Sequence, residues 1–286
     1  MPDRATRIDA HQHFWRYDPA EYDWIGPDMQ AIARDFLPAD LAPEMDAAGI
    51  DASIAVQARQ SDAETDWLLA MADDAASRIA GVVGWVDLRS DALAARLEQL
   101  EGRDKLVGFR HVVQGEPDER FILGDAFIRG VKQTLAAGYA YDVLVFHTQA
   151  PHVAEFLERC GAEGAGGRFV LDHIAKPAIG DRASFGRWAG SIRAMAQHPG
   201  CYCKLSGMVT EGDWANWSAA DFTPYLDTVL DAFGADRVMF GSDWPVCLVA
   251  GAYTQISGLV ADYVKANCPE KEAAIFGENA RKAYSL

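Results

Sequence analysis

The chain has 286 residues, 50% of them hydrophobic, and a formal net charge of −16 at pH 7. Its length suits one large domain or two ordinary ones, with enough apolar residues for a substantial core. The acidic balance and the lack of a basic stripe disfavour nucleic acid as a partner. No apolar run approaches the ~20 residues of a membrane-spanning helix, and residues 1–4 carry charge with no apolar segment behind them. We therefore expect neither a membrane span nor a secretory leader.

The five cysteines indicate a reducing compartment. Their number is odd, and the sequence contains no Cys-x-x-Cys pair. The one close pair in the sequence, Cys201 and Cys203, lies in an apolar run typical of a strand. We therefore expect buried free thiols in a cytoplasmic protein, rather than a disulfide framework or a zinc knuckle.

The first motif is His11-Gln12-His13, at the end of a short strand predicted over residues 7–10. In an extended chain, residues two apart point to the same side, so both imidazoles face one way. Such a pair is half of a metal site. A turn with two solvated histidines would have the same sequence, and the motif alone does not decide. The aromatic, aperiodic stretch from Trp15 to Pro27 is expected to be a long loop over a site.

From residue 38 onward, apolar strand-like runs alternate with helical patterns, without a linker or a low-complexity segment. Alternation predicts a parallel sheet, and eight units at this length predict one α/β domain over residues 1–286, a closed (β/α)8 TIM barrel. A doubly wound open sheet is the alternative, weakened because no Gly-x-Gly-x-x-Gly follows the first strand. The further strands are expected at 52–57, 82–86, 106–112, 141–146, 168–171, 202–205 and 237–240, and the helices at 38–48, 64–76, 91–101, 124–137, 151–160, 184–197, 221–233, 254–266 and 270–283.

Polar side chains gather where the expected strands end, which is where a (β/α)8 barrel carries its chemistry. The lower parts of the strands are mainly aliphatic, whereas the upper ends include five of the seven histidines. A purely structural barrel is not expected to show that asymmetry. The residues at these ends are His11, His13, Gln57, Arg59, Arg110, His111, His147, Asp172, His173, Lys204, Ser206, Ser242 and Asp243.

Some of these residues also have structural interpretations. Asp243 could cap the next helix, and Asp172 is expected to do the same, because strand alternation points it away from His173. Lys204 lies in an apolar stretch, so it either extends its ammonium group to solvent or needs a partner or a ligand.

The remaining basic residues divide into inner and outer positions. Arg110 and His111 are adjacent on one strand and cannot both face the barrel interior, so one of them is expected to be structural. His147 fits a position behind the site or at its rim. His152 and His198 lie on expected helical or loop surface and are interpreted as solvated.

Several motifs together resemble the amidohydrolase superfamily. They are Asp9-x-His11-x-His13, Asp172-His173 and Gly241-Ser242-Asp243-Trp244-Pro245. Gly-Phe-Arg-His, Leu-Asp-His-Ile-Ala-Lys-Pro and Cys-Lys-Leu-Ser-Gly more narrowly resemble its sugar-lactonase branch, which includes L-fuconolactonases and L-rhamnonolactonases. The resemblance covers essentially the whole chain. It implies a barrel that hydrolyses the ester of a sugar lactone, in a pathway such as L-fucose catabolism.

The resemblance also implies roles for individual residues. Asp243 becomes the general base, with His173 as a second catalytic residue. His11, His13, His173 and Asp243 become ligands of one divalent metal, such as Zn²⁺, or active-site groups without it. The fourth expected strand offers no lysine that could be carboxylated, which favours at most one metal, and some relatives are thought to work without any. The candidates for substrate binding are Arg110, His111, Lys204, His147, Trp24 and Gln57.

Hydrolysis of a cyclic ester needs a water nucleophile, a polarised carbonyl and a proton for the leaving alkoxide. Asp243 can take the proton from water and return it to the ring oxygen. Zn²⁺ on the histidines would acidify the water or polarise the carbonyl. Without a metal, Lys204, Arg110 and protonated His173 would supply the positive field. A covalent route fits less well, because Gly-x-Ser-x-Gly is absent and neither serine at the strand ends has a histidine beside it.

Two other functions stay open at this stage. A hydrolase of an acidic lactone, or a metal-dependent decarboxylase, would need several pocket arginines, and the strand ends offer only Arg110 and Arg59. A non-catalytic binding barrel is disfavoured, because a binding protein has no need of a general base such as Asp243. A monomer and a homodimer both fit the composition, and the particular sugar and ring size are open. Three tryptophans offer flat faces to a sugar ring, although packing accounts for most tryptophans: Trp15, Trp24 and Trp244.

Overall fold

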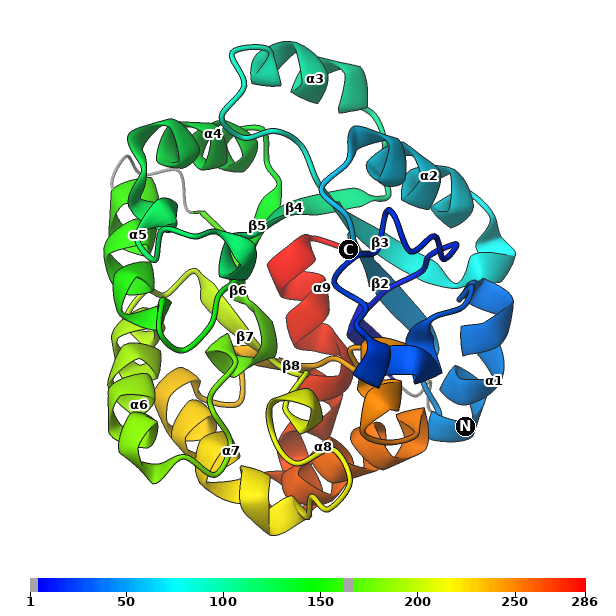
Figure 1. Ribbon diagram of the computed structural model, residues 1–286, viewed down its shortest axis with the longest axis vertical. Coiled ribbons are helices and arrows are strands. Elements are labelled where there is room, and N and C mark those ends of the chain that lie inside the picture. The colour runs from blue at the N-terminus through cyan, green and yellow to red at the C-terminus, as the bar shows by residue number, and fades with distance from the viewer. Residues whose placement is uncertain (1–4, 162–166) are drawn as a thin grey trace.

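Eight parallel strands lie side by side in the order β1 to β8, with helices arranged around them (Figure 1). The computed structural model describes residues 5–161 and 167–286. Where β1 meets β8, the His13 N–H donates to the Trp244 carbonyl over 2.7 Å, and the Asp243 N–H donates to the His11 carbonyl over 2.8 Å. The predicted (β/α)8 barrel is confirmed, and the open sheet is excluded. The strands are β1 Ile8–Gln12, β2 Ala52–Val56, β3 Ile79–Gly84, β4 Leu106–Val112, β5 Ala140–Leu144, β6 Phe169–Leu171, β7 Cys201–Leu205 and β8 Val238–Phe240.

The helices lie close to their expected positions. The first ends at Gly49, whose φ of +67° is the left-handed conformation that glycine adopts without a steric cost. Residues 1–4, on which the expectation about a secretory leader rested, lie outside the described residues. The α-helices are α1 Pro38–Ala48, α2 Asp62–Ala72, α3 Leu93–Leu100, α4 Asp125–Ala136, α5 Val153–Gly161, α6 Arg182–Ala196, α7 Ala219–Phe233, α8 Tyr253–Asn267 and α9 Asn279–Tyr284.

The third strand is shifted from its expected range of 82–86. It begins at Ile79 and ends at Gly84, because the chain leaves the sheet at Trp85. There the Thr65 side chain replaces a neighbouring strand: its hydroxyl oxygen accepts from the Trp85 N–H and its hydroxyl donates to the Trp85 carbonyl, both over 2.8 Å. A side chain from the preceding helix, α2, thus ends the strand, which no local sequence pattern reveals.

The last helix closes the amino-terminal end of the barrel, where Figure 1 shows it in red near the barrel axis. A single helix was expected over 270–283, but a π-helix at Ala274–Glu278 precedes α9. Tyr284 packs in one apolar cluster with interior strand residues such as Ile54 and Val83. The aliphatic lower half of the barrel is therefore sealed by α9, and polar groups begin only above it.

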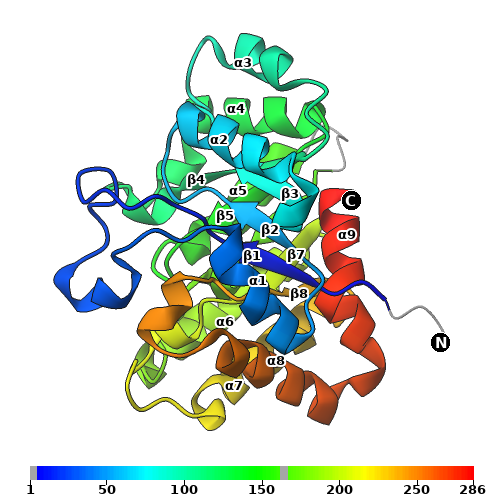
Figure 2. The same cartoon turned by 90° about the vertical axis from the view of Figure 1, so that its right-hand side faces the viewer.

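The segment after β1 projects from the opposite end of the barrel, as the blue excursion in Figure 2. Backbone hydrogen bonds of 3.0 and 2.9 Å join Trp15 to Phe36 at its base. The Trp15 ring also contacts those of Tyr22 and Phe36, with centroid separations of 5.7 and 5.6 Å. Aromatic packing thus fixes a loop that has no regular secondary structure over most of its length.

Two expectations about the whole chain can be compared with the structure. Cys160, Cys201, Cys203, Cys247 and Cys268 are all buried and free, as predicted. Within the two described ranges, no helix combines the length and the apolar character needed to cross a bilayer.

Candidate active site

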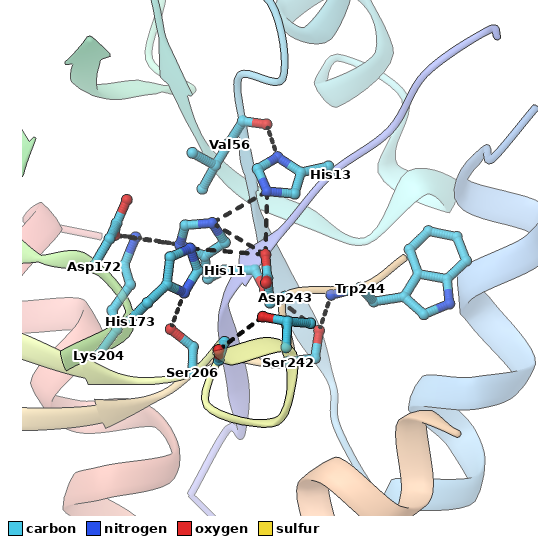
Figure 3. Close-up of polar contacts among 12 residues, drawn as sticks. His11, His13, Val56, Asp172, His173, Lys204, Ser206, Ser242, Asp243 and Trp244 are labelled. Carbon is cyan, nitrogen blue, oxygen red and sulfur yellow. Dashed lines mark hydrogen bonds and ion pairs between the residues drawn. The ribbon is translucent and has the colours of Figure 1, made fainter. Parts of the chain in front are cut away.

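The ends of β1, β6 and β8 bring three histidines and one aspartate together (Figure 3). Asp243 Oδ1 lies 3.4 Å from His13 Nε2 and 3.8 Å from the Nε2 atoms of His11 and His173. The two Nε2 atoms of the His-x-His motif lie 3.2 Å apart. All four side chains are nearly or fully buried. The predicted convergence of these residues is present, and the solvated-turn interpretation of the motif is wrong.

Alternation along β1 orients the two imidazoles. Gln12, between them, points the other way and donates to the Ser53 hydroxyl over 3.1 Å. His13 Nδ1 lies 2.8 Å from the Val56 carbonyl, which can only accept, so Nδ1 carries the proton and Nε2 has a free lone pair. The Arg110 guanidinium, which can only donate, lies 3.2 Å from His11 Nε2. The Lys204 ammonium lies 3.1 Å from the other ring nitrogen, Nδ1, so both nitrogens of His11 face a cation. The Nε2 atoms of His11 and His13 face the same point of the site, 3.2 Å apart.

This donor set suits a cation. His11, His13 and Asp243 each offer one ligand atom, and these atoms lie within 4.8 Å of one another. Two imidazole lone pairs and a carboxylate are ligands that Zn²⁺ prefers. His173 Nε2 lies on the same side and could complete the set.

The turn after β8 aims Asp243 into the barrel. Asp9 Oδ1 accepts from the Ser242 N–H over 2.9 Å, and its Oδ2 accepts from the Ser242 hydroxyl over 2.6 Å. The Tyr253 hydroxyl donates to the same oxygen over 3.0 Å. Asp243 itself has a φ of +58°, a left-handed conformation held by these neighbouring bonds. Burial raises the pKa of Asp9 to about 6, although these hydrogen bonds act in the opposite direction.

Burial and charge set opposite protonation states for the carboxylate and the imidazoles. Burial alone would raise the pKa of Asp243, but the charges of His173 and His11 and the hydrogen bond to His13 outweigh it and hold that pKa well below its usual range. Burial lowers the pKa of His173 to about 4. Burial and then the charge of Lys204 lower the pKa of His11 well below its usual value. At neutral pH the site thus holds an ionised Asp243 beside neutral His11 and His173, the state that binds metal.

His173 reaches the site through a left-handed turn. Four consecutive residues from His173 to Lys176 have φ values between +41° and +58°, although none is glycine. Such backbone is costly and tends to occur at functional sites. Gly207 makes room for it, because a Cβ there would lie 2.4 Å from His173 Nδ1.

The same turn overturns the expectation for Asp172. The strand ends at Leu171, so alternation stops there and Asp172 points into the barrel instead of capping a helix. Its carboxylate lies 2.9 Å from Arg110 Nη1 and 2.9 Å from Lys204 Nζ. Burial alone would raise the pKa of Asp172, but the charge of Lys204 and then that of His11 hold it well below its usual value.

Lys204 lies beneath the histidines and is fully buried. Its ammonium group lies 2.5 Å from Asp142 Oδ2 and 3.1 Å from His11 Nδ1. Burial raises the pKa of Asp142 to about 6, against the lowering effect of Lys204. Lys204 does not line the cavity, so it supplies charge to the site rather than direct contact with a substrate. The sequence analysis missed Asp142, whose only signal is a carboxylate inside an apolar strand.

Arg110 and His111 point to opposite faces of β4, as strand alternation requires. Arg110 faces the interior, where its guanidinium donates to the Gln57 backbone carbonyl and, over 3.0 Å, to the Gln57 side chain. His111 faces outward, stacked on Phe121 at 5.1 Å with its Nε2 2.7 Å from Glu116. The expected substrate contact of His111 therefore fails, because its ring lies on the outer side of β4. Gln57 is fully buried and contacts Arg110 rather than the cavity.

A cavity of about 750 Å³ opens above this centre. His13, His173, Asp243 and Arg110 lie on its wall, and Trp24, from the loop after β1, is 41% exposed there. The expected loop over the site is thus confirmed. The sequence analysis missed three further lining residues from the loops after β6 and β7: Lys176, Glu211 and Trp214.

The remaining aromatic and histidine candidates lie elsewhere. Trp15 and Trp244 are buried in aromatic packing, so neither offers a face to a ligand. His147 Nδ1 lies 3.2 Å from the Lys176 carbonyl at the rim, outside the cavity lining. His152 and His198 are partly buried rather than fully solvated, and the His198 ring packs edge-on against Phe169 at 5.4 Å.

The fold and the site together define a class, the (β/α)8 barrel hydrolases whose histidines and aspartate converge at the carboxyl ends of the strands. Residues 8–286 match the model of the amidohydrolase family, and the chain belongs to that family. It is 47% identical over 292 residues to an L-fucono-1,5-lactonase of Burkholderia multivorans, covering 99% of this chain and 97% of that protein. An L-fucono-1,5-lactonase of Burkholderia ambifaria is 35% identical, over 98% and 96% of the two chains.

A solved structure shares the whole fold. It is an amidohydrolase from Burkholderia multivorans with bound zinc, 46% identical, with a TM-score of 0.93 over 99% of this chain and 100% of that one. The predicted membership of the amidohydrolase superfamily is thus confirmed.

Proposed function

We propose that the protein is a sugar lactonase, which hydrolyses an aldonolactone such as L-fuconolactone to the aldonic acid. One observation carries the proposal: Asp243, ionised at neutral pH, lines the cavity with its Oδ1 within 3.8 Å of the Nε2 atoms of His11, His13 and His173. The names of the two Burkholderia relatives support the substrate class. A role in L-fucose catabolism belongs to the same proposal.

Asp243 acts as the general base. Its carboxylate takes a proton from the attacking water, whose oxygen forms a bond to the lactone carbonyl carbon. When the bond to the ring oxygen breaks, the leaving alkoxide takes a proton back from Asp243, so the acid product forms with no net proton on the enzyme. His173 also lines the cavity and can hold the reacting water, since its Nδ1 lies 2.9 Å from the Ser206 hydroxyl and its Nε2 faces Asp243.

His11, His13, His173 and Asp243 would hold one divalent metal, which when bound supplies a Lewis acid for the carbonyl or the water. The convergence of one ligand atom each from His11, His13 and Asp243 supports this assignment, and the zinc-bound relative is consistent with it. The chain's own residues fix the orientation of the imidazole ligands: the Val56 carbonyl orients His13, and the Ser206 hydroxyl orients His173.

Positive charge around the carbonyl comes from Arg110 and, through the interior, from Lys204. Arg110 lines the cavity and is clamped by Gln57 and Asp172, so its guanidinium is already in place before a substrate binds. Trp24 offers its exposed face to the sugar ring. Gln57 acts through Arg110, and His147 acts through the Lys176 backbone at the rim.

The acidic-lactone hydrolase and the decarboxylase fit less well. Either would need unpaired cations to hold substrate carboxylates, whereas the described cations of the cavity wall have carboxylate partners: Arg59 with Glu21, Arg110 with Asp172, and Lys176 with Glu211. A binding protein would gain nothing from an ionised carboxylate beside a metal-type histidine set. A cytoplasmic location, consistent with five free cysteines, and a homodimer are predictions that accompany the proposal.

The test is lactone hydrolysis followed with a pH indicator. L-fucono-, L-galactono-, D-arabino- and L-rhamnono-lactones would be offered to the wild type, to Asp243→Asn and to Asp236→Asn. Asp236 is exposed and paired with Lys271 on the surface, so it is a matched control. We expect Asp243→Asn alone to lose about 100- to 10,000-fold in kcat. A folded wild type that turns over none of these lactones would overturn the proposal, and a chelator arm separates metal-dependent from metal-free hydrolysis.

A further inference from the structure

A partly buried ion pair forms one wall of the cavity, away from the reacting centre. Lys176 follows the turn after β6, and Glu211 ends a 3-10 turn, Val209–Glu211, after β7. Lys176 Nζ lies 2.9 Å from Glu211 Oε1, and the two side chains are only 15% and 16% exposed. Both residues line the cavity. A cation and an anion are thus presented side by side to anything that enters.

The surrounding structure fixes this pair. The Lys176 N–H donates to the His173 carbonyl over 2.8 Å, so the lysine and the catalytic histidine belong to one turn. Its ammonium group lies 5.3 Å from the centre of the Phe146 ring, a cation–π contact. On the other side, the Glu211 carbonyl accepts from the Ile179 N–H over 3.3 Å, which joins the loops after β6 and β7. The ion pair is therefore part of the resting structure of the site.

The opposite wall repeats the arrangement. Arg59 forms an ion pair with Glu21, and Glu64 accepts the Arg59 N–H over 2.8 Å. Counted over the described lining residues, four carboxylates face three cations: Glu21, Asp23, Glu211 and Asp243 against Arg59, Arg110 and Lys176. A substrate carboxylate would therefore have to displace an existing carboxylate partner.

We propose that the Lys176–Glu211 pair sets the charge specificity of this site, which admits neutral polyhydroxy lactones and rejects lactones that carry a carboxylate. This inference rests on the proposed lactonase function and narrows its substrate class. The ammonium group donates to a sugar hydroxyl and the carboxylate accepts from one, so a neutral polyol satisfies both without breaking the pair. Removing the charge of Glu211 leaves Lys176 as an unpaired cation on the wall, which favours an anionic substituent.

The experiment compares two lactones that differ at one carbon. L-galactono-1,4-lactone carries a hydroxymethyl group at C6, and galactaro-1,4-lactone of the same configuration carries a carboxylate there. The ratio of kcat/KM for the neutral to the charged lactone is measured for the wild type, for Glu211→Gln and for the double variant Lys176→Met/Glu211→Gln. Glu98→Gln, an exposed position on α3, removes the same charge far from the cavity and is the control.

We expect the ratio to fall about tenfold or more in Glu211→Gln, to recover in the double variant and to stay unchanged in Glu98→Gln. Turnover of the neutral lactone with an unchanged ratio in Glu211→Gln would overturn this inference alone. A fall of equal size in Glu98→Gln would also overturn it, because net charge would then be the cause. A wild type that hydrolyses neither the neutral lactone nor any other in the panel would overturn the proposed function, and this inference with it.

Discussion

The Tyr284 hydroxyl lies 2.9 and 2.8 Å from the two carboxylate oxygens of Asp142, so the last helix is bonded to a carboxylate in the barrel interior. Asp142 in turn holds Lys204, whose ammonium group lies 3.1 Å from His11. A continuous chain of polar contacts thus runs from α9 to the candidate metal site. The amino-terminal half of a barrel normally serves stability, and here that half is joined directly to the chemistry.

Replacing Tyr284 with phenylalanine tests the first link of this chain. The variant keeps the ring in its apolar cluster but removes a hydrogen bond to a charged group, which contributes about 1.5–3 kcal/mol. We expect the thermal midpoint to fall by several degrees while kcat changes little, because Lys204 still pairs with Asp142. Calorimetry would measure it, with Tyr139→Phe as the control, since that ring packs edge-on against Phe109. Equal midpoints for the two variants would contradict the expectation.

Lys204→Met should be strongly destabilising. It leaves two buried carboxylates, Asp142 and Asp172, without their shared cation, and breaking a buried ion pair in this way costs about 3–5 kcal/mol. Adding Asp142→Asn should recover part of that loss, with a coupling of about 1–3 kcal/mol in a double-mutant cycle. The exposed pair of Lys271 and Asp236 provides the matched cycle, in which little coupling is expected. Additive effects at the buried pair would show that the contact does not stabilise the fold.

Because Glu64 is buried, we expect the folded protein to lose stability as the pH rises. Burial raises its pKa from 4.5 to about 7, outweighing the N–H groups of Arg59 and Ala58 and the charge of Arg59. A raised acid pKa means that the folded state binds the proton more tightly than the unfolded state does. The contribution of Glu64 to stability is therefore greatest below about pH 4.5 and declines until about pH 7. The decline is on the order of 3 kcal/mol.

Glu64→Gln isolates this effect, because its amide oxygen can still accept the N–H bonds of the loop after β2. We expect the wild type to lose stability relative to Glu64→Gln between pH 4.5 and 7, measured by thermal unfolding across that window. Glu98→Gln on the surface should show no such trend. A difference between wild type and Glu64→Gln that does not vary with pH would mean that folding leaves the pKa of Glu64 unshifted, which would contradict the expectation.

Zinc binding is expected at one equivalent per chain. After treatment with a chelator, calorimetric titration at pH 7.5 should give a single site that His13→Gln weakens by more than the roughly 100-fold that loss of an outer partner costs. His152→Gln, before α5, should bind as the wild type does. Because the ligand imidazoles must be neutral, affinity should also fall on acidification. Binding that survives His13→Gln would place the zinc elsewhere.

The sequence analysis correctly oriented the residues whose direction depends only on the period of their strand or helix. The alternation of β1 places His11 and His13 on one side, and the same rule separates Arg110 from His111 on β4. Nearly every helix and strand was expected within a few residues of its observed bounds. These features are local, so the chain pattern determines them.

The residues that the sequence analysis misplaced or missed owe their positions to tertiary contacts. Asp172 points inward because a left-handed turn starts at His173, and no glycine announces that turn. Asp142 has a role only because Lys204 and Tyr284 converge on it from distant elements. Lys176 and Glu211 face each other across two loops, whose conformations have no period from which to predict them.

The contacts that aim Asp243 have a consequence for biosynthesis. Asp9 accepts hydrogen bonds from Ser242 and Tyr253, which follow it by 233 and 244 residues, so the ribosome makes these two partners long after Asp9. A nascent chain that has completed seven strands already carries the paired histidines but neither Asp243, the proposed general base, nor the turn that directs it. We therefore expect every prematurely terminated product that stops before β8 to be inert rather than partly active, and hydrolysis to begin only once β8 and the turn after it have folded.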